Sequence, residues 1–202
     1  MDSAVGLVQA YLRVNGYFTV SEYPILAATR GGFRTMTDLD VLAFRFPGAG
    51  THPAGWRVLP DDVLALPDSA LGVAAGQADM LVGEVKEGPA VLNAAATDPG
   101  VLRAALVRFG CTSPDAAAHA VTTLRREGRA TLPSGHCIRL VAFGSTADEG
   151  ATHAYHVVRL GHVIEFLRRY LREHWDLVRH SETKDAALGF MLLTEKALRG
   201  VG

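Results

Sequence analysis

Two apolar segments of this 202-residue chain carry ionisable side chains, and this combination restricts the fold more than any other feature. The first contains Asp38 and Asp40 among Leu, Val, Ala and Phe, and the second contains Glu84 and Lys86 among Met, Leu and Val. Side chains alternate along a strand, so each pair lies on one face. Burying a charge is costly unless it is paired or bound to a metal. We therefore expect two strands that bring these residues to a common site.

The surrounding patterns predict an α/β protein. Strands are expected at residues 17–25, 36–46, 79–85 and 137–143, and helices at 3–14, 99–109, 114–127, 157–175 and 183–199. Ser3, Asp98 and Ser113 are the expected N-caps, and the last two precede a proline, which is typical of a first helical position. The order predicts a mixed central β-sheet flanked by helices.

We expect one domain over residues 1–202. Residues 47–79 are rich in proline and glycine and predict a loop-rich insertion. Residues 176–202 form a helical extension in this interpretation. Its apolar arc predicts a covered core helix, with a dimer surface as the alternative; the arc consists of Leu188, Phe190, Met191, Leu192, Leu193 and Leu198. The helix before it has an expected buried stripe of Leu160, Val163, Ile164, Leu167, Leu171 and Trp175.

Composition bounds the class of protein. Apolar residues make up 49% and the formal net charge is -1, which excludes a histone-like binder but not a local basic face. Cys111 and Cys137 have no metal-binding spacing, so we expect a reduced, cytoplasmic protein. The first ten residues lack a signal-peptide pattern, and no apolar run approaches the roughly 18 residues of a membrane span. No membrane partner is expected.

Carboxylates and a lysine at neighbouring strands suit phosphodiester cleavage. A hard cation polarises the phosphate and lowers the pKa of an attacking water. Magnesium prefers oxygen ligands and usually takes one or two carboxylates. Asp40, Glu84 and the carbonyl of Val85 are the candidate ligands, and Lys86 is placed to stabilise charge on the phosphate.

An Asp in an apolar strand followed by Glu-x-Lys on the next strand resembles the PD-(D/E)xK nuclease superfamily. That group includes restriction endonucleases, archaeal Holliday-junction resolvases and RecB-type exonuclease domains. The resemblance implies a restriction-endonuclease-like three-layer core with Asp40, Glu84 and Lys86 as catalytic residues. It also implies Mg²⁺ or Mn²⁺ as the cofactor and a nucleic-acid substrate, DNA before RNA. Many such nucleases act as dimers, so the resemblance makes a homodimer possible, and the sequence leaves the oligomeric state open.

The chain departs from the pattern at several positions. Leu39 stands where the superfamily name has proline, and the gap between the Asp and the Glu is long. The opening helix offers Gln9 where several of these nucleases have an acidic residue, and Glu22 is a possible substitute. Asp38 is a rival for the role of Asp40. No Gln-x-x-x-Tyr of the RecB type follows the lysine.

Four other interpretations compete. Glu84 and Lys86 are a surface pair in the first. The second keeps the same fold as a catalytically silent nucleic-acid-binding or assembly module.

In the third, Asp38-Leu39-Asp40 matches the D-x-D of sugar transferases, but the preceding nucleotide-binding unit is missing. In the fourth, the helices at 99–109 and 114–127, followed by a hairpin around Pro133–Gly135, form a small winged helix-turn-helix, and Arg125, Arg126 and Arg129 contact the nucleic-acid backbone.

Three histidines complete the candidates: His153, His156 and His162. Their spacing fits neither H-E-x-x-H nor a zinc finger, and no cysteine joins them. We interpret them as hydrogen-bonded or exposed side chains.

Overall fold

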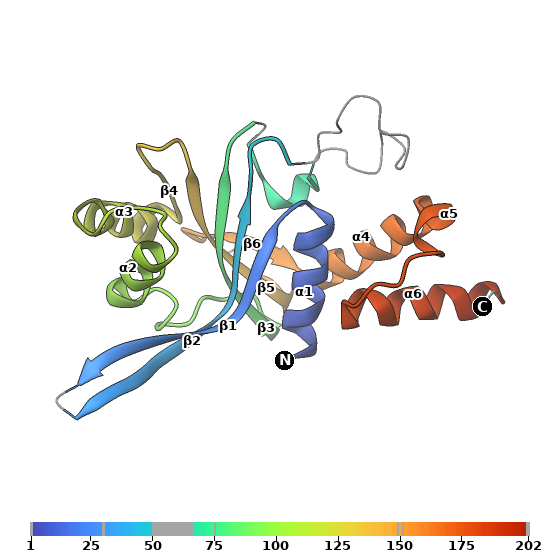
Figure 1. Ribbon diagram of the computed structural model, residues 1–202, viewed down its shortest axis with the longest axis horizontal. Helices are drawn as coiled ribbons and strands as arrows, with labels where there is room; N and C mark the ends of the chain where they lie inside the picture. Colours follow the sequence, from blue (N-terminus) through green and yellow to red (C-terminus); the bar gives the residue numbers. More distant parts are fainter. Residues whose placement is uncertain are drawn as a thin grey trace.

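A six-stranded β-sheet lies at the centre of the computed structural model, which describes residues 2–29, 31–49, 67–74, 76–148, 150 and 152–200. Its strands are β1 (Phe18–Thr29), β2 (Gly32–Arg45), β3 (Asp79–Pro89), β4 (Arg129–Thr131), β5 (Cys137–Thr146) and β6 (His156–Arg159). The helices are α1 (Ser3–Val14), α2 (Pro99–Arg108), α3 (Pro114–Glu127), α4 (Leu160–Glu173), α5 (Trp175–Val178) and α6 (Ala186–Arg199), with a 3₁₀ turn, η2 (Ser69–Leu71). The predicted α/β class and mixed sheet are confirmed (Figure 1).

The order of the strands across the sheet is β1-β2-β3-β5-β4, and β6 also pairs with β5. The first three strands are antiparallel, whereas β5 runs parallel to β3. Pairing of β2 with β3 runs from Arg45 opposite Asp79 to Val41 opposite Gly83 and ends there, while β3 stays paired with β5 beyond Gly83. Asp40 and Glu84 therefore lie where β2 and β3 separate.

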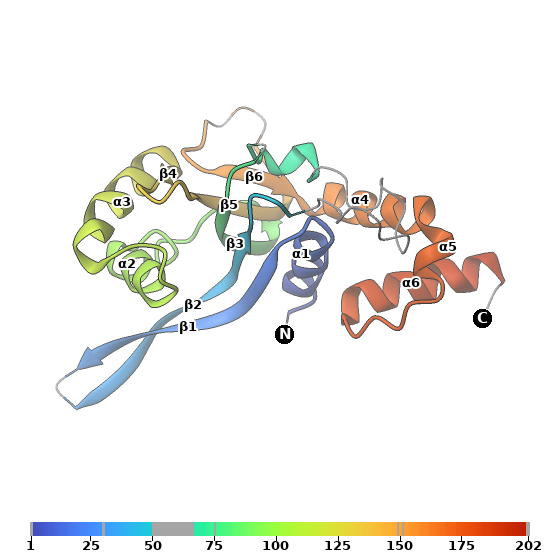
Figure 2. The same cartoon turned by 45° about the horizontal axis from the view of Figure 1, so that its top comes forward.

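Alternation along β3 divides the core into two layers. Leu81 and Val85 pack with α1 and α4 on one face, and Met80 and Val82 pack with α2 and α3 on the other. Glu84 has the same parity as Met80 and Val82, so it faces the α2–α3 side. Figure 2 shows the sheet between these two groups of helices.

The ends of the helices follow their capping residues. Asp98 accepts hydrogen bonds from the first amides of α2, and Ser113 does the same for α3, as predicted. At α1 the prediction was wrong by one residue, because Asp2 is the N-cap and its carboxylate accepts a hydrogen bond from the Ala4 amide (2.7 Å). Ser3 is the first helical residue.

Several elements differ from expectation. The first two strands are longer than predicted and form a hairpin that projects from the body (Figure 1). Strands β4 and β5 form the hairpin that one of the alternatives placed around Pro133–Gly135, whereas β6 was not predicted. His156–Arg159 pairs with β5, so the helix expected from residue 157 begins at Leu160. Within the described part of the predicted insertion, η2 is the one helical turn, and residues 50–66 and 75 lie outside the described part.

The prediction of a covered C-terminal helix was wrong. Leu192 is buried, but Phe190, Leu193 and Leu198 are 71%, 62% and 71% exposed. One side of α6 packs against α1 and α4, and nothing in the described chain covers the other side. Ile164, expected in the buried stripe of α4, is also exposed. None of the helices in the described ranges is both long and apolar enough to cross a bilayer.

Two buried carboxylates stabilise the α1–α4 side. Asp79 accepts two hydrogen bonds from the Arg139 guanidinium (2.7 and 2.8 Å) and one from the Tyr17 hydroxyl (2.5 Å). Asp68 accepts hydrogen bonds from the Tyr11 hydroxyl (2.7 Å) and His162 Nε2 (2.6 Å). Asp68 connects α1 and α4 to the segment that precedes β3, and Arg139 reaches the same segment by donating from Nη1 to the Leu71 carbonyl (2.6 Å).

Candidate active site

Asp40 lies beside the Glu-x-Lys segment. Its Oδ2 accepts a hydrogen bond from the backbone N–H of Val85 (2.8 Å), the residue between Glu84 and Lys86. This bond forms just past Gly83, where the pairing of β2 with β3 stops, so the carboxylate occupies the place of a strand partner. The structure thus brings the three predicted catalytic residues into one cluster.

Glu84 is the buried member of the cluster, with 1% of its side chain exposed. Its Oε1 accepts a hydrogen bond from Asn93 Nδ2 (2.6 Å) and forms an ion pair with Lys86 Nζ. Burial raises the pKa of Glu84, and the negative charge of Asp40 raises it further. Lys86 and Asn93 act in the opposite direction and support the ionised form.

Lys86 connects this buried carboxylate to solvent, because its side chain is 39% exposed. The hydrogen bond with Glu84 raises the pKa of Lys86, and the charges of Glu84 and Asp40 add to this effect. Lys86 therefore stays protonated, and its partly exposed side chain lies between the Glu84 carboxylate and solvent. A positive group in this position can contact an anion that approaches from solvent.

Asn93 comes from the segment between β3 and α2 and was not predicted as a site residue. Its side-chain oxygen accepts a hydrogen bond from the Ala96 amide (2.6 Å), which fixes the end that donates to Glu84. The segment that leads to Asn93 lies close against β5. The Ala90 amide donates a hydrogen bond to the Thr146 carbonyl, and Ala90 contacts Gly144. A Cβ at position 144 would be 2.5 Å from the Ala90 nitrogen. Only glycine fits there.

The donor set fits a hard cation. One oxygen of each carboxylate, Asp40 Oδ1 and Glu84 Oε2, accepts no hydrogen bond from the residues that the structure describes. In an extended strand the N–H and C=O of a residue point to the same side, so the Val85 carbonyl leaves β3 toward Asp40. These are the oxygen ligands that Mg²⁺ prefers. No group of three or more His, Cys, Asp or Glu side chains is arranged for a metal within the described ranges.

The other predicted acidic positions lie outside the cluster. Asp38 is exposed farther along β2, opposite Pro24, and the acidic charge that shifts the pKa of both Glu84 and Lys86 is that of Asp40. Glu22 lies in β1 between the partners of Val41 and Leu39, hence opposite Asp40. It has a left-handed φ of 50°, and its Oε1 accepts from the Asp2 amide at 3.3 Å.

Gln9 is also not part of the cluster. It is buried in α1, which covers the face of the sheet opposite to Glu84. Its side chain makes no hydrogen bond with the described residues.

The histidines interpreted as hydrogen-bonded side chains have identifiable contacts. His156 Nε2 lies 2.6 Å from the Ala70 carbonyl, and His162 pairs with Asp68. His153 stacks on Tyr155, with ring centroids 4.7 Å apart. Each of the three therefore has a contact within the described part of the chain.

The predicted basic residues belong to α3 and β4. Arg125 and Arg126 are exposed on the last turn of α3, and Arg129 is exposed on β4. The apolar sides of α2 and α3 pack on the sheet with residues such as Leu102 and Leu124. The two helices therefore cover one face of the sheet, and β4 pairs with the start of β5 within that sheet.

Comparisons with known proteins identify no relative: no family model, no curated protein and no solved structure matches the chain. Asp40, Glu84, Lys86 and Asn93 form one contiguous cluster of contacts around β3.

Proposed function

We propose that the protein is a metal-dependent phosphodiester hydrolase that acts on nucleic acid. The observation that carries this proposal is the hydrogen bond from the Val85 amide to Asp40, since it places a second carboxylate beside the Glu84–Lys86 pair. With a divalent cation bound to the two carboxylates, the cluster would carry a net positive charge together with Lys86, which suits an anionic phosphodiester.

The order of elements supports a restriction-endonuclease-like fold as part of this proposal. An opening helix, α1, precedes β2 with Asp40 and β3 with Glu84 and Lys86. A helical segment, a further strand, β5, and a further helix, α4, follow. This is the order that the resemblance to PD-(D/E)xK nucleases implies.

Asp40 and Glu84 would hold Mg²⁺ or Mn²⁺ through their free oxygens, with the Val85 carbonyl as a third ligand. When bound, the cation supplies polarisation of the phosphate and neutralises charge that develops during cleavage. Burial raises the pKa of Glu84, and the positive charge of Lys86 or of a bound cation acts in the opposite direction by favouring the carboxylate. Asn93 holds the same carboxylate in one orientation.

Lys86 has the role of orienting the attacking water and of donating to a phosphate oxygen. Its Nζ is anchored by Glu84, and its exposed side chain leaves donors for the substrate. A lysine presents three donors and no acceptor, so it can bind Glu84 and an oxyanion at once. The paired position limits its motion, which lowers the entropic cost of that contact.

Cleavage assays test the proposal directly. Labelled single- and double-stranded DNA and RNA are incubated with Mg²⁺ or Mn²⁺, and the small diester bis(p-nitrophenyl) phosphate is included. We expect cleavage that Glu84→Gln and Asp40→Asn abolish. Glu87→Gln and Asp38→Asn are the matched controls, because each removes an exposed carboxylate from the same strand and should leave activity intact.

The absence of turnover on every substrate would favour the silent binding or assembly module. Cleavage that survives Glu84→Gln would refute the proposed site. Isothermal titration with Mn²⁺ separates these cases further, because the proposal requires specific binding that Asp40→Asn abolishes.

The cysteines and the last helix bear on the compartment and the oligomeric state that the proposal includes. Cys111 and Cys137 are both free thiols, which suits a reducing cytoplasm. The exposed apolar side of α6 is the surface on which a homodimer would form. Light scattering of Phe190→Lys against wild type would test the second point, with loss of the dimer as the expected result.

A further inference from the structure

A groove lined by arginines lies between α2 and α3. It has a volume of about 640 Å³ and takes Arg103 from α2 and Arg125 and Arg126 from α3. The rest of its lining is small or neutral: Pro99, Gly100, Ala118, Val121 and Thr122. No acidic side chain lines it among the described residues, so the groove carries a local positive charge on a chain whose net charge is close to zero.

The three guanidinium groups keep donors available. Arg103 Nη2 donates to the Pro114 carbonyl at the start of α3 (3.2 Å), and its other nitrogens make no hydrogen bond with the residues that the structure describes. Arg126 is partly neutralised by its exposed neighbour Glu127. Arg125 has no hydrogen bond or ion pair with any described residue. An anion in the groove would thus meet at least two uncompensated cations.

The groove begins where the segment of the candidate active site ends. Asn93, which donates to Glu84, starts a compact turn in which it accepts hydrogen bonds from the Ala96 amide (2.6 Å) and the Thr97 hydroxyl (3.4 Å). The turn leads to Asp98, the N-cap of α2, and Pro99 of the groove follows directly. Five residue steps separate Asn93 from Asp98, which limits the distance between their Cα atoms to about 18 Å.

We propose that this groove binds the phosphate backbone of a polynucleotide on the strand that runs through the candidate active site. The inference rests on the proposed function and specifies its substrate as a polymer. One strand of a duplex rises 3.4 Å per nucleotide, so the Asn93-to-Asp98 span that leads to the groove corresponds to at most about five nucleotides. A dinucleotide or a small diester reaches only the site, whereas an oligonucleotide reaches both.

Binding without turnover tests the groove. Fluorescence anisotropy with labelled DNA and RNA oligonucleotides is measured in EDTA over a range of salt concentrations. We expect Arg103→Gln with Arg125→Gln to weaken binding about ten-fold. The slope of log K against log salt should fall by about two, one for each lost phosphate contact.

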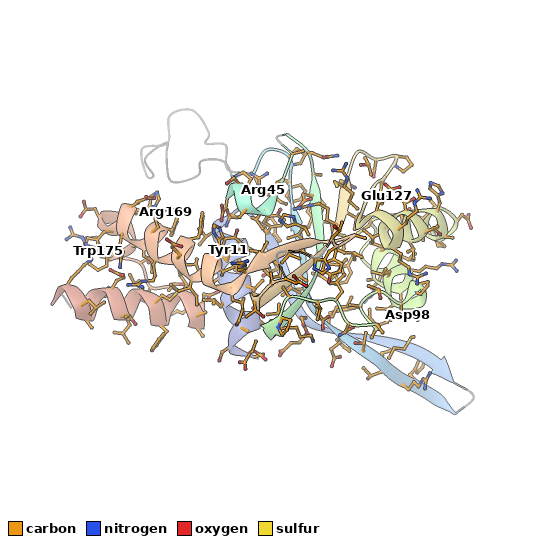
Figure 3. The ribbon with its side chains drawn as sticks, turned by 180° about the vertical axis from the view of Figure 1, so that it is seen from behind. Tyr11, Arg45, Asp98, Glu127, Arg169 and Trp175 are labelled. Carbon is orange, nitrogen blue, oxygen red and sulfur yellow. The ribbon has the colours of Figure 1, made fainter. Side chains whose placement is uncertain are left out.

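Arg168→Gln with Arg169→Gln is the matched control. Both residues are exposed on α4, and Figure 3 shows Arg169 on the side of the molecule away from Asp98 and Glu127, which mark α2 and α3. This control removes the same charge and should leave affinity and salt slope unchanged. Arg125→Gln alone is a second variant that should fold normally, because Arg125 makes no hydrogen bond or ion pair with any residue that the structure describes.

Unchanged binding by the groove variant, or equal weakening by the α4 control, would overturn the inference. Loss of binding to RNA alone or to DNA alone would support it and identify the polymer. Its failure is distinguishable from failure of the proposed function, because Glu84→Gln should bind normally yet not cleave. Conversely, the groove variant should hydrolyse bis(p-nitrophenyl) phosphate at the wild-type rate while it cleaves oligonucleotides more slowly.

Discussion

Asn93 Nδ2 donates a 2.6 Å hydrogen bond to Glu84 Oε1, the same oxygen that pairs with Lys86. The bond joins a loop after β3 to a carboxylate that is almost fully buried within β3. One oxygen takes both donors, and the other accepts no hydrogen bond from the residues that the structure describes. The orientation of the free oxygen thus depends on a residue nine positions away in the chain.

Asn93→Ala should reduce metal affinity and cleavage without unfolding the protein. Loss of a hydrogen bond that orients a metal ligand typically costs about 10–100-fold in metal affinity or activity. We expect a decrease of this size in kcat/KM and in Mn²⁺ affinity measured by calorimetry. Thr97→Ala, in the same turn, serves as the control, because the Thr97 hydroxyl bonds only to backbone carbonyls. Wild-type metal affinity in Asn93→Ala would contradict the role.

Gly144→Ala should destabilise the fold near the site. An added Cβ would lie 2.5 Å from the nitrogen and 2.6 Å from the Cα of Ala90, so the backbone must move. Overpacking of this kind costs about 1–3 kcal/mol. Gly161→Ala is the control, because no atom lies within 4 Å of its Cβ position and alanine favours a helix. Urea denaturation measures the free energy of unfolding of both variants. Equal values for Gly144→Ala and Gly161→Ala would contradict the prediction.

Local patterns predict the part of the site that lies on one strand. Glu84 and Lys86 share a face because alternation follows from strand geometry alone. The resemblance favours Asp40 as their partner, and the structure places it there because β2 and β3 are neighbours whose pairing stops at Gly83. Asp38 lies on the same face of the same strand, so the sequence pattern does not distinguish it from Asp40. The position where β2 and β3 stop pairing does.

The remaining features depend on tertiary structure. Asn93 has no local signature, since a loop asparagine is common and its partner lies nine residues earlier. Strand β4 has three residues and β6 has four, too few for alternation to identify them. The apolar arc of α6 predicts burial, but burial requires a neighbour, and only Leu192 and its immediate surroundings have one in the described chain.

Asp68→Asn should cost stability at neutral pH and little in acid. Burial alone would raise the pKa of Asp68, but hydrogen bonds from His162, Tyr11 and the Ala70 amide lower it below the ordinary 3.8. A lowered folded pKa stabilises the fold above the unfolded pKa, and this contribution is lost as the pH falls through the folded value. We expect a difference of about 1–3 kcal/mol from wild type at neutral pH.

Denaturation curves over a pH series check the sign of this effect. The stabilities of wild type and Asp68→Asn should approach each other as the pH falls below 3.8. A difference that grows on acidification would contradict the lowered pKa.

Asp79→Ala should be among the most destabilising single changes. Arg139 is buried and donates two hydrogen bonds to Asp79, so the variant leaves a buried guanidinium without its carboxylate. Removing one partner of a buried ion pair typically costs about 3–5 kcal/mol. Asp176→Ala removes the partner of Arg179 from an exposed pair (3.5 Å) and should change stability little. Equal effects of the two variants in urea denaturation would mean that burial of the Asp79–Arg139 pair does not contribute to stability.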